Sequence, residues 1–328
     1  MSFTTAGQVQ AGGFVQLVMP DLSAGSALQS EWGFEVPAVS YAAPTSGAPS
    51  AIAFFNASAR TLTVATAGAT MSQSSQHVIT ITNVRTPSSI VGANQVRATT
   101  QDSAGRTIDT TTSMATDAIA AGALVSAELD ASTDTPGFLH EAIVTFTTAG
   151  QVQAGGKIVL VLPDLPDTGR GWRFQSPSVT FTAPSSGAPS ASASFNSSLR
   201  TLTLTTANAT MAQATQHAIT ISNVHTPSSI VDATTMQAMV LDSTDKSIDA
   251  TSDMVVDQIA AGSFTGARSF DTGTDTPGVK DTATLSFTPT GTIHVGGSIE
   301  IVMPALTGLQ SPWSFETPSA SWTTPSAD

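Results

Sequence analysis

The residues of this chain that could do chemistry are few, and carboxylates at two recurring positions come first among them. The stretch Asp130-Ala-Ser-Thr-Asp134-Thr-Pro-Gly returns as Asp271-Thr-Gly-Thr-Asp275-Thr-Pro-Gly. Carboxylate and backbone carbonyl oxygens are the ligands that Ca²⁺ takes in proteins. The calcium candidates are therefore Asp130, Asp134, Asp271 and Asp275. The alternative is a structural one, because Asp favours turns and neither stretch has the dense DxDxDG spacing of a dedicated calcium loop.

Three sequons could carry N-linked glycans. They are Asn56-Ala-Ser, Asn196-Ser-Ser and Asn208-Ala-Thr. The first two occupy equivalent positions in a predicted turn between strands, where a glycan would be exposed. A chain rich in Ser and Thr also produces sequons by chance, so the glycosylation sites Asn56, Asn196 and Asn208 are expected to be occupied only if the source is eukaryotic.

The histidines do not form a catalytic set. Of five histidines only the His77/His217 position recurs as the same residue, and neither has an acidic neighbour in sequence. A catalytic side chain in a duplicated module should recur in each copy. The chain also has no HExxH, GxSxG or P-loop motif. We therefore expect no enzyme, no catalytic residue and no cofactor other than the calcium considered above.

The charge balance restricts the partners. Apolar residues make up 40% of the 328 residues, which is too many for a disordered chain, and only 11% are charged. Lys and Arg number 11 against 24 Asp and Glu, a net charge of −13, so no basic surface is expected for nucleic acid or for anionic lipid. No apolar run is long enough to span a bilayer, and the absence of cysteine excludes disulfides and zinc ribbons. The N-terminus is not a signal peptide, so any export signal would lie upstream or have been removed.

Internal repetition organises the elements that must position these residues. Phe3–Gly13 recurs without change as Phe146–Gly156 and in altered form as Phe287–Gly297. Between Ala43–Gly122 and Ala183–Gly262 roughly 48 of about 80 positions are identical, which indicates a duplicated folding unit of about 140 residues. The expected units are 1–139, 140–279 and a partial third unit, 280–328, with the shared TDTPG turn at each joint.

Within a unit the pattern predicts strands. Ile158–Leu162 is a short apolar run ended by Pro163, and Thr61–Val64 and His77–Thr82 alternate with period two. Eight or nine short strands per unit favour an all-β fold of tandem Greek-key, immunoglobulin-like β-sandwich modules.

A tryptophan recurs in each unit, as Trp32, Trp172 and Trp313. Each is followed two residues later by Phe, and residues two apart on a strand face the same side. These aromatic pairs are expected to form the centre of each core, and a carbohydrate-stacking platform is the alternative.

The third unit ends early. Residues 280–328 hold the opening strands of a sandwich and would expose an apolar face. That face carries Ile299, Ile301, Met303 and Trp313. We expect either that the polypeptide continues or that another subunit donates the missing strands. The first unit in turn lacks the start of the strand that Glu141–Thr145 provides in the second. The segment from Phe3 duplicates that from Phe287, so a simple head-to-tail exchange is not expected to fill the gap.

The segments FTTAGQVQAGG, IVLVLPDL and HAITISNVHTPSS resemble modules of large, repetitive, Ser/Thr/Ala-rich surface proteins of algae and other protists and of extracellular filaments of environmental microbes. Bacterial tandem-sandwich adhesins share much of this character. The resemblance covers both full units and the partial third, and it carries no site residue beyond the sequons. It implies an extracellular or cell-surface protein that self-associates into a filament or forms part of a longer array. The alternative is an adhesin or carbohydrate-binding surface protein.

Overall fold

The described part of the chain is built from strands. The computed structural model describes residues 1–22, 31–88, 90–165, 171–305, 307 and 312–322. Within these ranges there are 23 strands and no helix, which confirms the all-β class. Among the same residues, accordingly, no helix could cross a membrane.

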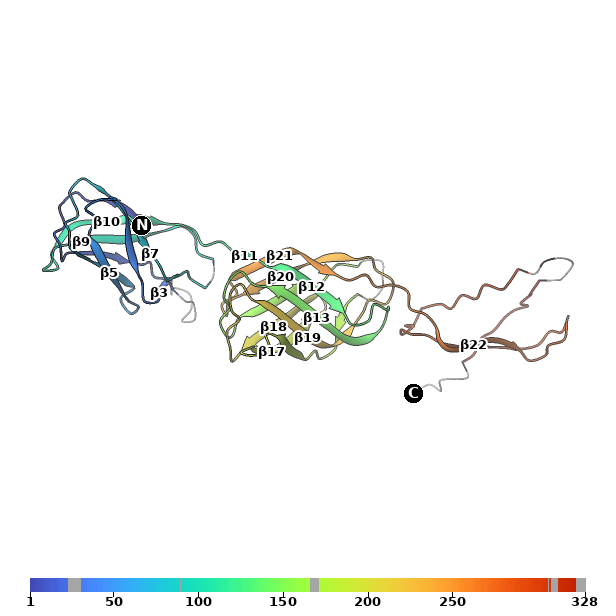
Figure 1. The fold of residues 1–328 in the computed structure, drawn as a ribbon. Coiled ribbons are helices and arrows are strands. Elements are labelled where there is room, and N and C mark those ends of the chain that lie inside the picture. Colours follow the sequence, from blue (N-terminus) through green and yellow to red (C-terminus); the bar gives the residue numbers. More distant parts are fainter. Residues whose placement is uncertain (23–30, 89, 166–170, 306, 308–311, 323–328) are drawn as a thin grey trace. The chain divides into compact units, whose positions relative to one another are not determined.

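The chain divides into two compact units, Met1–Thr292 and Ile293–Asp328. The larger unit contains two bodies of strands, which we call the first module (residues 1–116) and the second module (residues 122–256). Figure 1 shows them with some of their strands labelled.

The first module contains two main sheets. A three-stranded sheet has the order β1-β7-β4, a five-stranded sheet has the order β10-β9-β2-β6-β5, and β3 pairs with β8. Its strands are β1 (Ser2–Thr4), β2 (Phe14–Val18), β3 (Gly33–Phe34), β4 (Val39–Ala43), β5 (Ser50–Asn56), β6 (Thr61–Ala67), β7 (Gln76–Ile81), β8 (Val84–Arg85), β9 (Asn94–Gln101) and β10 (Thr107–Thr116).

The second module contains one continuous sheet of 11 strands. Its main path is β15-β19-β13-β12-β21-β20-β14-β18-β17, with β11 on β21 and β16 on β19. Its strands are β11 (Gly122–Ala123), β12 (Val125–Ala131), β13 (Leu139–Thr147), β14 (Lys157–Val161), β15 (Arg173–Phe174), β16 (Val179–Ala183), β17 (Ser190–Asn196), β18 (Thr201–Ala207), β19 (Gln216–His225), β20 (Thr234–Leu241) and β21 (Ser247–Val256).

Alternation of side chains along these strands builds the core. In β14, Ile158 and Leu160 are fully buried while their neighbours are only half-buried. The neighbouring strand β18 buries Leu202 and Leu204, while Thr201, Thr203 and Thr205 are only half-buried. Because the side-chain period of a strand is two, one face of each half of the sheet meets the other in a single apolar cluster, as in a β-sandwich.

The strand β12 lies in the second module, although it precedes the expected start of the second repeat at 140. It pairs antiparallel with β13 and parallel with β21, so that it joins the two halves of the sheet (Figure 1). Leu129 of β12 is fully buried and Ala131 nearly so. The sheet of the second module therefore begins near Gly122. The sequence repeat, in contrast, predicts the boundary between the two modules at the TDTPG turn.

Glycine permits the close approach that begins this module. A Cβ atom on Gly122 would lie 2.2 Å from Oδ1 of Asp249, and Gly122 pairs in parallel with that residue. Any larger side chain would displace β11 from β21. Gly122, which belongs to the first repeat in the sequence, is thus a packing residue of the second module.

The partial third repeat forms only a hairpin. Strand β22 (Thr265–Thr272) pairs antiparallel with β23 (Ala283–Thr288). Among its described residues, the unit Ile293–Asp328 has no strand. Of the four residues expected on an apolar face, Met303 is half-buried. The other three are exposed: Ile299, Ile301 and Trp313, whose side chain is 44% exposed.

The expected aromatic core is confirmed in the second module. Trp172 is 5% exposed and belongs to the main apolar cluster together with Phe174. Trp32 in the first module packs against the core but is half-buried. The two modules thus place the same aromatic pair at different depths.

Candidate functional site

Two aspartates at the first joint interact in the structure. Asp257 follows β21, and its carboxylate oxygen Oδ2 accepts a hydrogen bond from the Ala131 amide at 3.3 Å. Burial raises the pKa of Asp257 to about 6, and the hydrogen-bonded Asp130 side chain and the charge of Asp134 add to the shift. The sequence analysis proposed Asp130 and Asp134 but missed Asp257. The only signal for it was its recurrence, since Asp117 holds the same place in the first repeat.

The carboxylates are not gathered around a common centre. Among the residues that the structure describes, no group of three or more His, Cys, Asp or Glu side chains could hold a metal ion. At the second joint, Oδ1 of Asp275 accepts a hydrogen bond from the Thr272 hydroxyl at 2.8 Å, as a turn residue does. Asp271 is exposed on β22 and is not brought to Asp275 by any described contact. Calcium at these joints stays a prediction.

His140 lies beside the first joint. Its Nδ1 is 2.9 Å from the Ser132 hydroxyl oxygen. Burial lowers the pKa of His140, while the Glu141 backbone and the Asp134 carboxylate act in the opposite direction. A neutral ring that fixes the turn between β12 and β13 accounts for this arrangement.

All three sequon asparagines are exposed. Asn56 ends β5 and its Oδ1 accepts a hydrogen bond from the Ala59 amide at 3.0 Å, while Asn196 at the end of β17 accepts one from Leu199 at 3.1 Å. Asn208 follows β18 with a φ of 68° and donates to the Ser190 hydroxyl. These positions are compatible with an attached glycan, and occupancy stays a prediction.

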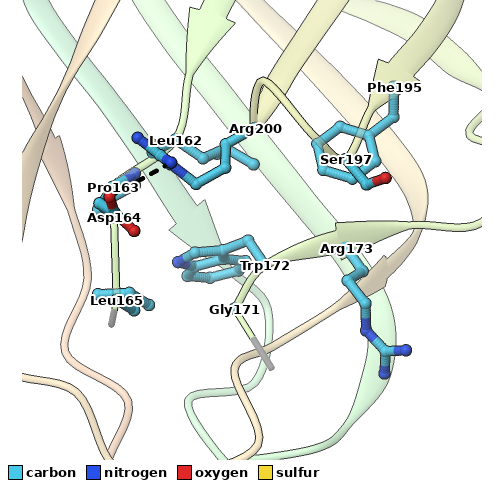
Figure 2. Close-up of a pocket in the computed structure, with 10 residues that line it drawn as sticks. All are labelled: Leu162, Pro163, Asp164, Leu165, Gly171, Trp172, Arg173, Phe195, Ser197 and Arg200. Atoms are coloured by element: carbon cyan, nitrogen blue, oxygen red, sulfur yellow. Dashed lines mark hydrogen bonds and ion pairs between the residues drawn. The ribbon is translucent and has the colours of Figure 1, made fainter. Parts of the chain in front are cut away.

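A cavity of about 290 Å³ lies next to Trp172 (Figure 2). Arg200 forms an ion pair with Asp164 at 3.3 Å, and its Nε donates to the Leu162 carbonyl oxygen at 3.4 Å. The cavity is lined by Leu162, Pro163, Asp164, Leu165, Gly171, Trp172, Arg173, Phe195, Ser197 and Arg200. An indole, guanidinium groups and a hydroxyl are the side chains that sugar sites use, but the Trp172 ring is too buried to offer a stacking face.

The same ion pair recurs in the first module. Arg60 lies 3.1 Å from Asp21, the counterparts of Arg200 and Asp164. A feature present in both modules at the end of the same strand is explained by the fold, because the arginine holds the chain that leaves β2 or β14. This recurrence favours a structural role for the cavity wall.

The recurring histidine is a core residue. His217 packs against Phe146 and edge-on to Phe181, and His77 packs against Phe3. Both rings are buried, and burial lowers the pKa of His217, although the Ala212 backbone opposes the shift. Neutral aromatic packing explains the position better than acid–base chemistry does.

A carboxylate that accepts backbone hydrogen bonds also recurs, as Asp249, which is buried, and Asp109, which is half-buried. Asp249 accepts hydrogen bonds from the amides of Ala149 and Gly150 at 3.0 Å, and Asp109 accepts one from Gly7. Burial raises the pKa of Asp249, against the effect of these amides. The carboxylate attaches the turn after β13 to β21, which is again a structural task.

The comparisons with known proteins place the chain in no family. No protein-family model matches, and no curated protein is significantly similar. Among solved structures, the C-terminal domain of the Streptococcus agalactiae AgI/II polypeptide BspA is similar. The match is 10% identical in sequence, covers 77% of this chain and 85% of the BspA chain, and has a TM-score of 0.25. The C-terminal domain of the antigen I/II-family protein AspA of Streptococcus pyogenes is 7% identical over 75% of this chain and 85% of its own, with a TM-score of 0.27.

The serine-rich repeat adhesion glycoprotein Srr1 of Streptococcus agalactiae is also similar. The match is 9% identical in sequence, covers 76% of this chain and 85% of the Srr1 chain, and has a TM-score of 0.19. Such scores are far below those of proteins with one fold. They assign neither a family nor a ligand to this chain.

Proposed function

We propose that the chain is a structural segment of an extracellular or cell-surface array of β-sandwich modules, a filament, stalk or shaft, and that it is not an enzyme. The modules are proposed to be of immunoglobulin-like, Greek-key type, repeating about every 140 residues. The observation that carries the proposal is the position of β12. The segment that follows the first module is built into the sheet of the second, between β13 and β21.

This connection differs from a flexible linker. A strand paired on both sides can leave the sheet only if its ladders break and Leu129 leaves the core. Pulling on the chain between modules therefore acts on a central strand of a folded sheet. Near-identical modules connected in this way suit a protein whose task is to span distance under load.

The remaining features agree with this task. The recurring polar side chains, Asp249, His217 and Arg200, are each explained by packing or by a structural hydrogen bond. Charged residues are sparse and predominantly acidic, with a net charge of −13.

The proposal is tested by locating the native protein. Antibodies against the recombinant chain should label the outside of intact cells and decorate extended structures in negative-stain images. An antigen found only after cell lysis would overturn the proposal. Specific binding of the folded chain to a glycan array would favour the adhesin alternative.

A further inference from the structure

Strand β5 forms an edge of its sheet. The five-stranded sheet of the first module ends with β5, and among the described residues this strand pairs only with β6. The counterpart strand β17 likewise ends the path of the sheet in the second module and pairs only with β18 among the described residues. Each edge therefore presents a row of backbone N–H and C=O groups to which a further strand could bind.

The two edge strands differ on the face that points away from the core. Ile52 and Phe54 of β5 are 72% and 52% exposed, whereas their counterparts in β17 are Ser192 and Ser194. Isolated apolar side chains on a surface need no explanation, but two adjacent ones on one face of an edge strand form the start of a patch. The first module has this patch and the second module has hydroxyl groups in its place.

The apolar side chains of β5 continue across the sheet. Ile52 lies opposite Ala65 of β6, which in turn lies opposite Phe14 of β2. The counterparts of these three residues in the second module form the same row and are all polar: Ser192, Thr205 and Lys157. We call Phe14, Ile52, Phe54 and Ala65 the outer patch. It distinguishes the first module from a second module of closely similar sequence.

Strand β5 lacks the features that protect edge strands. Its seven residues, Ser50–Asn56, include no charged residue and no proline, and their pairing with β6 has no register shift. Charged side chains, prolines and β-bulges are the usual means of preventing edge-to-edge pairing. An unprotected edge with exposed apolar side chains is a template for the addition of a strand.

We propose that two copies of this chain pair through β5, antiparallel, about a two-fold axis at Ala53. In this register Ile52 of each copy lies opposite Phe54 of the other, and all seven residues of both strands are used. An aromatic side chain opposite a β-branched one is among the pairs that stabilise antiparallel sheets. A shift of two residues in either direction would place Phe54 opposite Ser50 or Ile52 opposite Asn56.

The sequence of β5 favours a second copy as its partner. The strand is apolar in the middle and polar at both ends, so it is complementary to itself when it runs antiparallel. It carries no charge, although the whole chain has a net charge of −13, so two copies meet along β5 without opposing carboxylates in the strand pair. On the inner face, the half-buried Phe55 comes to lie opposite Ala51 of the other copy and extends the apolar core across the edge.

The contact is isologous, so that it closes with two copies. A pair of seven-residue strands is smaller than a standard interface, and we expect a dissociation constant of about 10–100 μM. The inference goes beyond the proposed function, because it assigns to the first module a lateral partner, a second copy of this chain.

Sedimentation equilibrium of the whole chain, produced without N-glycosylation so that Asn56 is unmodified, tests the pairing. Ile52→Ser combined with Phe54→Ser gives β5 the serines of β17 and should weaken dimerisation by about tenfold or more. Both side chains are exposed, so the module should stay folded. The matched control is Leu199→Ser with Ile230→Ser, two residues of the second module that are each 64% exposed, and it should leave the dissociation constant unchanged.

Engineered cysteines test the register in a chain that has none. Ala53→Cys faces its own counterpart across the two-fold axis and should form a disulfide-linked dimer under mild oxidation. Ala51→Cys lies on the same half-buried face of β5. Its two copies would be about 14 Å apart and should cross-link about tenfold more slowly. Ala193→Cys makes the same substitution at the equivalent position of β17 and should be similarly slow.

The proposal fails if the chain remains monomeric up to about 1 mM, a concentration tenfold above the weakest constant expected. It also fails if the double serine substitution in β5 leaves dimerisation unchanged, or if Ala53→Cys and Ala51→Cys cross-link at equal rates. Binding of another protein's strand to β5 without self-association would belong to the first of these results. A chain that dimerises through β5 but is absent from the cell surface would keep this inference and refute the proposed function.

Discussion

At the scale of single residues, recurrence separates structural side chains from candidates for chemistry. His77 and His217, Asp109 and Asp249, and the arginine–aspartate ion pairs occupy equivalent places in the two modules and make equivalent contacts. The surroundings of Asp257 differ from those of its counterpart Asp117, because only Asp257 has β12 and the Asp130 side chain beside it.

The carboxylate of Asp257 should make stability depend on pH. Its folded-state pKa, about 6, lies above its unfolded value, so its contribution to stability is fully present below about pH 4 and is lost as pH rises through about 6. Asp257→Asn removes the ionisation and should raise the free energy of unfolding above pH 6 by less than about 1 kcal/mol, because the group is partly solvated.

Denaturant titrations at pH 4 and pH 7.5 check this expectation. The matched control is Asp117→Asn, which makes the same substitution at the equivalent position of the first repeat. An Asp257→Asn chain that is less stable than the parent at pH 7.5 would show instead that the ionised carboxylate is needed at the joint.

Trp172 is a large side chain of the second module's core. Trp172→Ala removes a buried indole and should cost about 3–5 kcal/mol of the second module's stability. Trp32→Ala should cost less in the first module, where the ring is half-buried. Chemical denaturation followed by module-specific proteolysis separates the two, and equal losses would contradict the difference in burial.

At the scale of elements, the strand pattern was predictable and the pairing of β12 was not. The structure has strands where the spacing indicates them, at the run Ile158–Leu162 and at the alternating segment His77–Thr82. It also buries the aromatic pair at Trp172, as its spacing indicates. A repeat period, however, has no preferred starting point: any shift of the limits fits the same 140-residue identity. Which side of a joint β12 belongs to depends on its pairing with β21, a contact with residues more than 120 positions away.

The joint carboxylates illustrate the same limit at a site. Asp130 and Asp134 were visible from their repeated spacing, but their nearest acidic partner, Asp257, is distant in sequence and becomes adjacent only through the insertion of β12. A turn role for Asp275 was the alternative to calcium binding, and the hydrogen bond between Asp275 and Thr272 agrees with the turn role. Local sequence identifies which side chains are polar and turn-forming, and long-range pairing decides which of them meet.

At the scale of the whole molecule, two modules of closely similar sequence should differ in stability. The second has one continuous core that includes Leu129, and the described residues of the first form two separate apolar clusters. Burying one leucine contributes about 1.5–3 kcal/mol. The first module should therefore unfold at a lower temperature than the second, by about 10 °C.

Calorimetry at low protein concentration should resolve two transitions, because modules with their own cores unfold separately. Leu129→Ala assigns them: it should lower the upper transition, at a cost of about 2–5 kcal/mol to the second module, and leave the lower one in place. A lower transition that responds to Leu129→Ala while the upper one stays in place would contradict this assignment, and with it the expected order of stability of the two modules.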